Sequence, residues 1–552
     1  MRFFSDIEFS QVKAARKAVD SKTATIVYTT WENPFARGGG IIAVANNYGA
    51  ELVRQGRNVI MLSPYHTFLS TAPEVGVHVK KLAEGEVSYG GQGVPFTLYE
   101  HIDANRLRWV LIKAAPYFEG GAGQTCPYLP YEALLGNAVF FCKVVPVALK
   151  TMGLDRNLIL HLQDWQTSSI SLTAKEAILS GELHSAATVL TMHNSYDSNL
   201  ETEKLCLLSD HAPRTVYQWM MPLADGPVST VSENFAEELT SDPAQTGIFA
   251  RHLQNWIKEN PIVGVNNGLF GASANPFPQG AGEEALLESK GIKRELMLKT
   301  LAKFEDPRVI GALDFKELLE KPETPIFMMF GRLDPGQKGF DVLASAIEAV
   351  AERRVDARFI LAPSSIDLDS PFADRPENRK QLEGLAQLGL LAHKLPGRVV
   401  IYPFRLESGY LEAMAGSSYA VFPSIYEPFG GATEPYLNGT PVIARQTGGL
   451  KQQVDHGETG FLYREEEAED YAAREIEWRE FQRADLGERS RSPIFRKMVA
   501  ALTNTLIEAC ELFQEDQSKY AKMLSKLYPK ACEFSWEKTA EQYQSIYDQA
   551  CS

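Results

Sequence analysis

The feature of this chain that most restricts its fold is a pattern that occurs twice along it. Short apolar runs rich in β-branched residues alternate with segments of helical period, which is typical of parallel sheets covered by helices. In the first half these runs predict strands at 24–28, 59–62, 109–113, 158–161 and 188–192. In the second half they predict strands at 326–330, 358–362, 399–402, 419–422 and 442–444. The sequence therefore predicts an α/β protein with two Rossmann-like domains.

The length of the chain agrees with two domains. Its 552 residues exceed the roughly 250 to 300 residues that one hydrophobic core usually organises. A Pro/Gly-rich stretch at 268–282 is the expected boundary, so 1–267 form the first domain and 268–533 the second. The segment 464–491 is dense in charges of both signs, and we interpret it as a solvated helix or insertion of the second domain.

Composition restricts the partners. The 55 basic and 70 acidic residues give a formal charge of −15, which opposes general binding to nucleic acid or to an anionic membrane. No segment approaches about 20 uninterrupted apolar residues, and the charged start lacks the apolar stretch of a secretory signal. We expect a cytoplasmic protein without a membrane span. The six cysteines are far apart, which is typical of reduced thiols.

Three groups of residues follow predicted strands and suit a phosphate or a sugar. Arg37 and the glycines Gly38, Gly39 and Gly40 open a helix, where backbone N–H groups attract anions; the alternative is a tight turn that needs positive φ. Arg332 and Lys338 flank a turn after the strand 326–330, where two cations could neutralise a leaving diphosphate; the alternative is two solvated surface cations.

The third group lies in the segment 422–450, FPSIYEPFGGATEPYLNGTPVIARQTGGL. Glu427 precedes a glycine-rich helix start with Gly430, Gly431 and Thr433, so a carboxylate for sugar hydroxyls stands beside backbone N–H groups for an anion. A polar turn that caps a helix would give the same pattern. The carboxyl ends of parallel strands form the edge where open α/β sheets bind ligands, so the three groups support one another.

At the end of another predicted strand stand His161, Asp164 and Trp165, and His193 and Asn194 end the next one. A histidine can bond a sugar hydroxyl and a tryptophan can cover a sugar face, although a lone histidine is often a satisfied structural residue. No pattern for a nucleophile and base or for a metal site is found. The Asp367, Leu368, Asp369 triplet is expected in a surface loop, so we expect no metal and no cofactor.

Taken in order, these motifs resemble the bacterial glycogen and plant starch synthases, which are retaining glycosyltransferases of the GT-B fold. The resemblance runs through most of the chain. It rests on Arg37-x-Gly39-Gly40-Ile41, 131–149 (YEALLGNAVFFCKVVPVAL), 161–167 (HLQDWQT), 191–194 (TMHN), 230–238 (TVSENFAEE), GVNNGL at 264–269, GRLDPGQKGFD at 331–341, YEPFGGATEPYLNGTPVIARQTGGL at 426–450 and FSWEKTAEQYQSIY at 534–547.

The resemblance implies two Rossmann-like domains facing a deep interdomain cleft, with the closing helix 534–552 returning to the first domain. It implies that Arg332 and Lys338 hold the donor phosphates, that Glu427 binds sugar hydroxyls and that His161 lines the sugar pocket. The residues implied in donor binding are Arg37, Gly39, Gly40, Asn267, Gly430, Gly431 and Thr433.

Departures from the family pattern fall near these positions. Gln163 stands for the second histidine of the family motif, and Phe270 stands where the family has Asp. Met414 replaces a family tyrosine that is a candidate for stacking on the donor base. The turn from Arg332 to Lys338 is one residue longer than in bacterial synthases, and the stretch from Glu427 to Gly439 is one residue shorter.

The resemblance implies transfer of glucose from a nucleotide-diphosphate glucose, ADP-glucose before UDP-glucose, to the non-reducing end of an α-1,4-glucan with retention. Two alternatives remain open at this point. One is a GT-B glycosyltransferase with another sugar or glycan acceptor, and the other is a catalytically weak glucan-binding regulatory protein. The sequence leaves the oligomeric state open.

Overall fold

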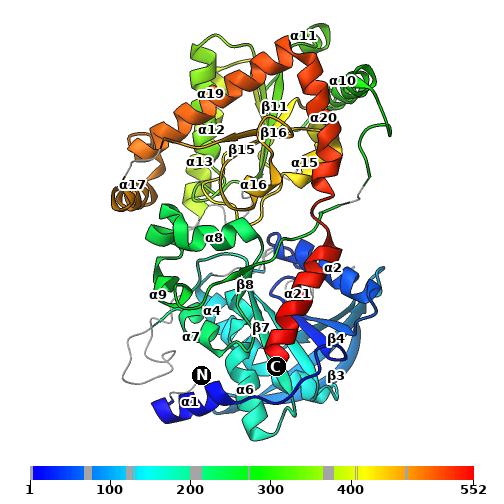
Figure 1. Ribbon diagram of the computed structural model, residues 1–552, viewed down its shortest axis with the longest axis vertical. Coiled ribbons are helices and arrows are strands. Elements are labelled where there is room, and N and C mark those ends of the chain that lie inside the picture. The colour runs from blue at the N-terminus through cyan, green and yellow to red at the C-terminus, as the bar shows by residue number, and fades with distance from the viewer. Residues whose placement is uncertain are drawn as a thin grey trace. The chain divides into compact units, whose positions relative to one another are not determined.

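The chain divides into two compact α/β units in the computed structural model (Figure 1). Residues 4–66, 78–119, 127–128, 131–198, 214–271, 274–364, 378–404, 406, 408–466 and 470–552 are described. The first unit comprises Met1–Thr240, Phe249–Gly268 and Ser535–Ser552, and the second comprises Ser241–Ile248 and Leu269–Phe534. The expected segment 464–491 lies in the second unit. The Asp367 to Asp369 triplet lies outside the described residues.

The first unit is built on a nine-stranded sheet with the order β3-β4-β5-β2-β1-β6-β7-β8-β9. Its strands pair in parallel except for the antiparallel β3–β4 and β4–β5 pairs. The strands are β1 (Thr25–Thr29), β2 (Val59–Pro64), β3 (Lys80–Tyr89), β4 (Gln92–Ile102), β5 (Arg108–Lys113), β6 (Leu158–Gln163), β7 (Ala186–Met192), β8 (Ser229–Thr230) and β9 (Val263–Gly264).

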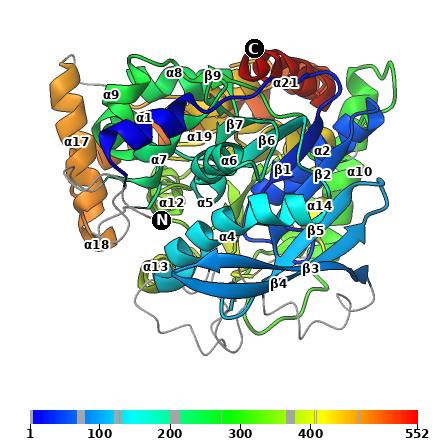
Figure 2. The same cartoon turned by 90° about the horizontal axis from the view of Figure 1, so that it is seen from below.

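Helices cover this sheet, and the longest of them is buried. They are α1 (Asp6–Ala14), α2 (Ile41–Arg54), α4 (Tyr131–Thr151), α5 (Trp165–Ser168), α6 (Ile170–Ser180), α7 (Val216–Met220), η3 (Met221–Leu223), α8 (Glu233–Ser241), η5 (Arg251–Leu253), α9 (Gln254–Ile257) and α21 (Trp536–Cys551). Within the described residues, one stretch is long and apolar enough to cross a membrane, Ala133–Thr151 of α4. It packs on β3 (Figure 2) and supplies Phe140, Phe141 and Val144 to the core. A buried core helix accounts for its apolar composition.

The last helix, α21, belongs to the first unit although the whole second unit precedes it in sequence. It packs on α2 and β7 (Figure 1). Its Tyr543, Ile546 and Tyr547 side chains are buried in the same core cluster as Ile26 of β1. The Tyr547 and Tyr48 hydroxyls bond each other at 2.9 Å. The apolar spacing of 543, 546, 547 and 550 follows the helical period, so this face is readable from the sequence.

The second unit holds a seven-stranded sheet with the order β10-β13-β12-β11-β14-β15-β16, parallel except for β10. The strands are β10 (Ile310–Gly311), β11 (Ile326–Arg332), β12 (Arg358–Ser364), β13 (Val399–Ile401), β14 (Tyr419–Phe422), β15 (Val442–Arg445) and β16 (Gly460–Tyr463). The helical elements are η4 (Gln245–Phe249), α10 (Glu283–Leu301), α11 (Phe315–Glu320), α12 (Phe340–Glu352), α13 (Arg379–Lys394), α14 (Tyr410–Gly416), α15 (Thr433–Asn438), α16 (Gly448–Gln453), α17 (Tyr471–Arg483), α18 (Leu486–Arg489), α19 (Pro493–Glu515) and α20 (Gln517–Ala531).

All ten predicted strands are present, and their ends differ by up to two residues. Six further strands were not predicted. The β3–β4 hairpin has mostly exposed or half-buried side chains, so it lacks a continuous apolar run. β8, β9 and β10 have two residues each, too short for a periodic signal, and β16 contains only four.

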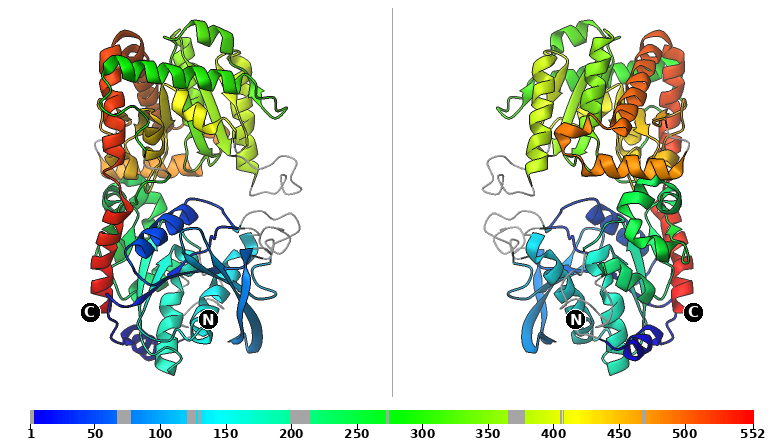
Figure 3. Two further views of the ribbon diagram at one scale, coloured as in Figure 1. Left: turned by 90° about the vertical axis from the view of Figure 1, so that its right-hand side faces the viewer. Right: turned by 90° about the vertical axis from the view of Figure 1, so that its left-hand side faces the viewer.

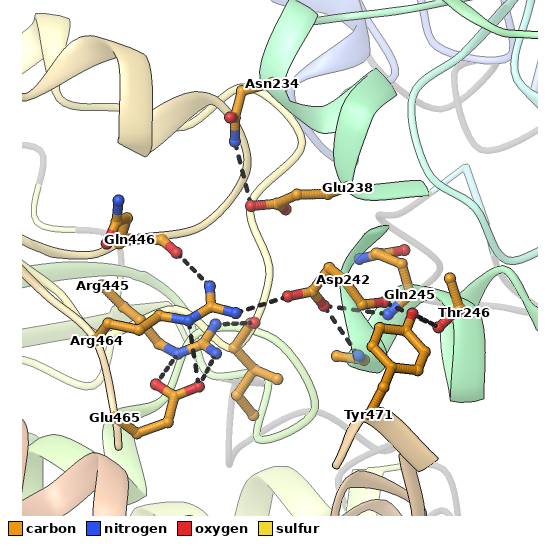
Figure 4. Close-up of polar contacts among 12 residues, drawn as sticks. Asn234, Glu238, Asp242, Gln245, Thr246, Arg445, Gln446, Arg464, Glu465 and Tyr471 are labelled. Carbon is orange, nitrogen blue, oxygen red and sulfur yellow. Dashed lines mark hydrogen bonds and ion pairs between the residues drawn. The ribbon is translucent and has the colours of Figure 1, made fainter. Parts of the chain in front are cut away.

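The division of the chain differs from the expected one at Ser241–Ile248, which the sequence placed with the first domain. This segment is held within the second unit by side chains of the charged stretch (Figure 4). Arg464 Nη2 lies 2.9 Å from Asp242 Oδ2, and Thr246 Oγ1 donates to Glu475 Oε1 at 2.8 Å. The partners are more than 220 positions apart in the sequence, so no local pattern predicts the contact.

The placement of α21 gives a stability prediction. Ile546 is 2% exposed in the core cluster of the first unit, so Ile546→Ala should lower the free energy of unfolding by about 2–5 kcal/mol. Hydrogen exchange measured by mass spectrometry should increase in β1 and β7 and stay unchanged in β11 and β12. Gln549→Ala, on the exposed face of the same helix, is the control. Faster exchange in β11 instead would contradict the assignment of α21 to the first unit.

Candidate active site

The turn after β11 carries two of the predicted site residues. β11 ends at Arg332, whose Nη2 donates to Gln337 Oε1 at 3.1 Å. The Asp334 carbonyl accepts the backbone N–H groups of Gln337 and Lys338 at 3.1 and 2.9 Å, which closes the turn. Gly339, the residue before α12, has φ of 72°, and a Cβ atom there would lie 2.1 Å from the Pro423 carbonyl oxygen. Glycine at 339 therefore lets this turn lie directly against the segment after β14.

Lys338 and Glu427, both predicted from the sequence, form an ion pair. Lys338 Nζ lies 2.6 Å from Glu427 Oε2, and the Ser424 hydroxyl donates to the same oxygen at 3.0 Å. The Lys338 side chain is 19% exposed and that of Glu427 is 10% exposed. The two loops follow neighbouring strands, because β11 pairs in parallel with β14. A cation and a carboxylate therefore stand together at the carboxyl edge of this sheet, where α/β proteins bind ligands.

The loop that carries Glu427 is fixed by Gly448, Gly449 and Gln453, none of which was predicted as a site residue. A Cβ atom at Gly448 would lie 1.8 Å from the Glu427 carbonyl oxygen, and one at Gly449 would lie 1.8 Å from that of Phe429. Gly449 N donates to Glu427 O at 3.0 Å. Gln453 Nε2 donates to Phe429 O at 2.8 Å. The start of α16 is therefore packed directly under the loop, which only glycines permit.

The predicted donor-binding residues after Glu427 lie on the same loop. Gly430 has φ of 90°, a conformation that favours glycine, and the Gly431–Ala432 turn leads into α15. Ala432 N donates to Gln453 Oε1 at 3.0 Å, so one of the expected anion-binding N–H groups is taken by a side chain. Thr433 is fully buried, and its hydroxyl has no hydrogen-bond partner among the described residues.

The loop that carries Glu427 is also held by a buried ion pair between Arg445 and Glu465, which Figure 4 shows. The Arg445 and Glu465 side chains are each 1% exposed and form a two-bond pair, with Arg445 Nε to Glu465 Oε2 at 2.8 Å. Arg445 Nη1 donates to the carbonyl of Ile425, two residues before Glu427, at 2.7 Å. Burial alone would raise the pKa of Glu465, but Arg445 lowers it to about 2. The pair is therefore ionised at neutral pH.

The charged segment 464–491 was expected to be solvated, and this expectation is wrong for two of its residues. Glu465 is buried against Arg445, and Arg489 is 3% exposed. Arg489 Nη1 donates to the carbonyl of Pro335 in the turn between Arg332 and Lys338. The segment also buries Trp478 and Phe481. The segment therefore supports both candidate loops. Glu465 holds Arg445, which donates to Ile425 before Glu427, and Arg489 donates to Pro335 before Lys338.

His161 was predicted to line the sugar pocket, and the structure places it in the core instead. It is fully buried in the middle of paired β6, with Nδ1 2.9 Å from the Tyr547 hydroxyl and Nε2 2.8 Å from the Thr191 hydroxyl. Burial, together with His193, lowers its pKa to about 3, so the ring is neutral. Trp165 is 8% exposed and also belongs to the core. Neither ring nitrogen of His161 is available to a ligand.

The polar group at the end of β6 is Gln163, which the sequence reasoning named only as a departure. Its Oε1 lies 2.8 Å from His193 Nε2, while its Nε2 is buried without a partner among the described residues. The next residue, Asp164, has φ of 62° and ψ of 178°, a strained conformation for a residue with a side chain. Burial raises the pKa of Asp164 to about 6, although Tyr217 and the His193 amide donate to its carboxylate.

The glycine loop of the first unit lies at the start of α2. Arg37 is exposed and donates from Nε to Pro34 O at 3.1 Å, and Gly39 and Gly40 precede the helix with φ values outside the positive range. The buried carboxylate of Glu32 accepts from Ile42 N at 3.3 Å and from the Tyr128 hydroxyl at 2.6 Å. A carboxylate of the chain itself thus occupies part of the predicted anion-binding helix start.

Three further positions complete the comparison with the sequence. Asn267 is 3% exposed in the first unit, and its backbone N donates to Val231 O at 3.3 Å. Met414 is fully buried in a core cluster, so this residue cannot stack on a nucleotide base. Phe270 packs edge-to-face on Phe429 with ring centroids 5.9 Å apart. Among the described residues, no group of three or more His, Cys, Asp or Glu side chains could hold a metal ion.

Glu434 is a further candidate that sequence reasoning missed. It lies in the first turn of α15, and the Tyr410 hydroxyl at the start of α14 donates to it at 3.3 Å. Burial raises its pKa, which the Tyr410 hydrogen bond opposes. Glu434 lies about one helical turn after Gly430 and Gly431, so its position beside the predicted donor-binding residues could have been read from the sequence.

Comparison with known proteins agrees with this arrangement. Residues 25–259 match the model of the starch synthase catalytic domain, and residues 312–492 match that of the glycosyl transferases group 1. A glycogen synthase of Thermotoga petrophila is 24% identical over 95% of this chain and 98% of its own. Glycogen synthase 2 of Geobacter sulfurreducens is 26% identical over 83% and 90%.

The chain is a glycogen and starch synthase-like glycosyltransferase of the GT-B fold. Among solved structures, the catalytic domain of starch synthase IV from Arabidopsis thaliana, bound to ADP and acarbose, aligns with a TM-score of 0.68. It is 18% identical and covers 97% of this chain and 100% of its own. A sucrose-phosphate synthase from Thermosynechococcus elongatus aligns with a TM-score of 0.53 at 19% identity, over 95% of this chain and 98% of its own. The predicted fold class is thereby confirmed.

The buried pair gives a prediction on stability. Arg445→Ala leaves the Glu465 carboxylate buried without its partner, so the free energy of unfolding should fall by about 3–5 kcal/mol. The double variant Arg445→Met/Glu465→Leu leaves no buried charge and should be more stable than the single variant. Denaturant unfolding of the three proteins measures this. Equal losses in the single and double variants would contradict the role of the pair.

The same pair gives a prediction on acid stability. The Glu465 pKa in the folded protein, about 2, is below the roughly 4.3 of an unfolded glutamate. Its stabilising contribution is therefore complete above pH 4.3 and is lost as the pH falls toward 2. Within this window the free energy of unfolding of the wild type should fall more steeply with acid than that of Arg445→Met/Glu465→Leu. Equal slopes of unfolding free energy against pH in the two proteins would show that Glu465 has the same pKa in the folded and unfolded states.

Proposed function

We propose that this glycosyltransferase transfers glucose from a nucleotide-diphosphate glucose to the non-reducing end of an α-1,4-glucan, with retention at the anomeric carbon. ADP-glucose is the favoured donor and UDP-glucose is the second candidate. The observation that carries the proposal is the Lys338–Glu427 pair at the carboxyl edge of the second sheet. The match of 25–259 to a starch synthase catalytic domain supports the substrate class, and the starch synthase IV structure with ADP supports the base.

The chemistry assigned to the second unit is binding of the donor and release of the diphosphate. Cleavage of the glycosidic bond leaves negative charge on the departing phosphate oxygen. Arg332 and Lys338 supply two cations at the end of β11, and preorganised charges of this kind stabilise the transition state more than they stabilise the bound donor. Glu427 accepts from sugar hydroxyls, and the backbone around Gly430 and Gly431 lies beside it. We assign Glu434, which lies in the first turn of α15 after these glycines, to hydroxyls of the nucleotide.

Retention follows from a front-face displacement. The leaving phosphate oxygen accepts the proton of the incoming glucan hydroxyl, which attacks the same face of the sugar that the phosphate leaves. No enzymic nucleophile is needed. Exclusion of water prevents hydrolysis of the donor. We assign Gln163, in place of His161, to the sugar because its amide has an unpartnered end at the edge of the first sheet. Arg37, Gly39 and Gly40 remain candidates for the diphosphate. No metal takes part in the proposal, and residence in the cytoplasm remains a prediction.

The test is a donor and acceptor screen followed by two variants. The wild type, with glucan and either ADP-glucose or UDP-glucose, should release nucleotide and lengthen the glucan, also in the presence of a chelator. Lys338→Ala should lower kcat by about 10²–10³-fold, and Glu427→Gln should lower kcat and raise the donor KM. Lys299→Gln, which removes an exposed lysine on α10, is the control.

Three outcomes would contradict the proposal. No turnover of either donor would favour the glucan-binding alternative, in which Lys338→Ala leaves glucan binding unchanged. Transfer to a small sugar without chain growth would favour the alternative acceptor. Wild-type turnover in Lys338→Ala would remove this lysine from the site.

A further inference from the structure

A pocket of about 130 Å³ lies in the second unit, apart from the candidate active-site residues. It is formed by α10, the end of α19 and the first turn of α20, and α10 and α20 lie side by side (Figure 3). The side chains of Lys290, Arg294 and Tyr520 line it, and the exposed residues Gly291 and Gln517 lie at its rim. None of these residues has a role in the glucosyl transfer proposed above.

Basic side chains gather on the face of α10 that meets the pocket. Lys290, Lys293 and Arg294 stand at i, i+3 and i+4, which places them on one side of the helix. Lys290 is 5% exposed and Arg294 is 7% exposed, which is rare for charged side chains without an anionic partner. Within the described residues, neither Lys290 nor Arg294 forms an ion pair with a carboxylate.

The guanidinium of Arg294 has few hydrogen bonds for a buried cation. Its Nη2 donates to Leu318 O at 3.5 Å and to Lys321 O at 3.4 Å, both at the long limit of a hydrogen bond. Its Nε and Nη1 are buried with no acceptor among the described residues. Burial lowers the pKa of Arg294 to about 10. An unpaired buried cation with free N–H groups is costly, so the site is chemically incomplete as it stands.

The neighbouring Lys290 has acceptors for its amine but no negative charge. Its Nζ donates to Ala415 O, Gly439 O and Thr440 Oγ1 at 2.8, 2.9 and 2.8 Å. All three acceptors are neutral, and burial lowers the pKa of Lys290 well below its ordinary value. Lys290 therefore adds positive potential to the pocket when it is protonated.

We propose that this pocket binds a small oxyanion of the phosphate class. The guanidinium of Arg294 has two nitrogens without an acceptor among the described residues, Nε and Nη1, and phosphate oxygens are strong acceptors for such N–H groups. α20 is 15 residues long, and its first residue, Gln517, lines the pocket, so the positive end of its dipole also faces the site. The pocket exceeds the roughly 30 Å³ share of one water molecule and has exposed residues at its rim through which an anion can enter.

The acidic groups near the pocket are few. Glu323 acts on Arg294 at longer range without an ion pair, and Asp516 at the start of α20 is exposed and accepts from Lys519 N. Arg358 adds a further cation, although it pairs with Asp356 and Glu317. The local balance is therefore positive in a chain whose overall formal charge is −15.

The experiment is calorimetric titration of the full chain with inorganic phosphate and, separately, with glycerol phosphate. Phosphate also has affinity for the cations of the candidate active site, so all titrations use Lys338→Ala as the background. Lys338→Ala should bind one phosphate. Adding Arg294→Gln should weaken that binding at least tenfold, while adding Lys299→Gln, an exposed lysine of the same helix, should leave it unchanged.

A second substitution tests the pocket without changing a charge. A Cβ atom at Gly291 has nothing within 4 Å, so Gly291→Ala should fold and retain phosphate binding, while Gly291→Phe should occupy the pocket and abolish it. Tighter binding of glycerol phosphate than of inorganic phosphate would assign the site to a phosphomonoester, and the reverse order to the free anion.

The proposal is overturned if Lys338→Ala binds neither compound, or if Arg294→Gln or Gly291→Phe binds phosphate as well as the background does. The readout is binding, so the result does not depend on turnover. A failure here therefore leaves the proposed glucosyl transfer untouched, and failure of that transfer leaves this site untouched.

Discussion

The ion pair between Lys338 and Glu427 depends on two loops that lie 89 residues apart in the sequence. Neither loop has a regular structure that would fix it, so each is held by side chains from elsewhere in the second unit. Arg489 holds the Pro335 carbonyl in one loop, and Arg445 holds the Ile425 carbonyl in the other. Arg445 has partners on two sides, Glu465 and Ile425, so its planar guanidinium fixes direction as well as distance. The arrangement of the site thus depends on residues that cannot touch a donor themselves.

Fixing a loop with buried charges costs free energy. Removing two ions from water costs several kcal/mol for each, and their attraction recovers this only when the geometry is good. Arg445 and Glu465 meet in a two-bond arrangement, and one further N–H of Arg445 remains for the Ile425 carbonyl. An apolar pair of the same volume would pack equally well but would have no donor for that carbonyl. What the charged pair adds in this structure is a donor for the Ile425 carbonyl, two residues before Glu427.

The sequence was sufficient for the central strands and for the positions of Arg332, Lys338 and Glu427 at the ends of β11 and β14, because apolar runs and strand-end positions are local signals. His161 was misassigned for a simple reason. The predicted strand ended at 161, whereas β6 continues to Gln163, so the residue at the sheet edge is two positions later. Residues 161 and 163 lie on the same face of the strand, so only the position of the strand end shows which of them reaches the edge of the sheet. The burial of Glu465 and Arg489 could not be predicted, since their partners are set by tertiary contacts and a run of mixed charges is usually solvated.

The carboxyl edges of the two sheets differ in charge, which under the proposed transfer separates binding of the diphosphate from binding of the sugar. At the edge of the second sheet stand Arg332 and Lys338, which suit a leaving diphosphate. At the end of β6 in the first unit the groups are the neutral amide of Gln163 and His193, whose pKa burial lowers to about 4. A neutral donor and acceptor bind sugar hydroxyls without attracting the diphosphate. A histidine at 163 would add a second titratable ring beside His193, and two neighbouring rings disfavour each other's protonation. Glutamine therefore keeps residue 163 itself uncharged over the range in which a histidine would titrate, which leaves the buried carboxylate of Asp164, with its pKa raised to about 6, as the group that titrates beside it.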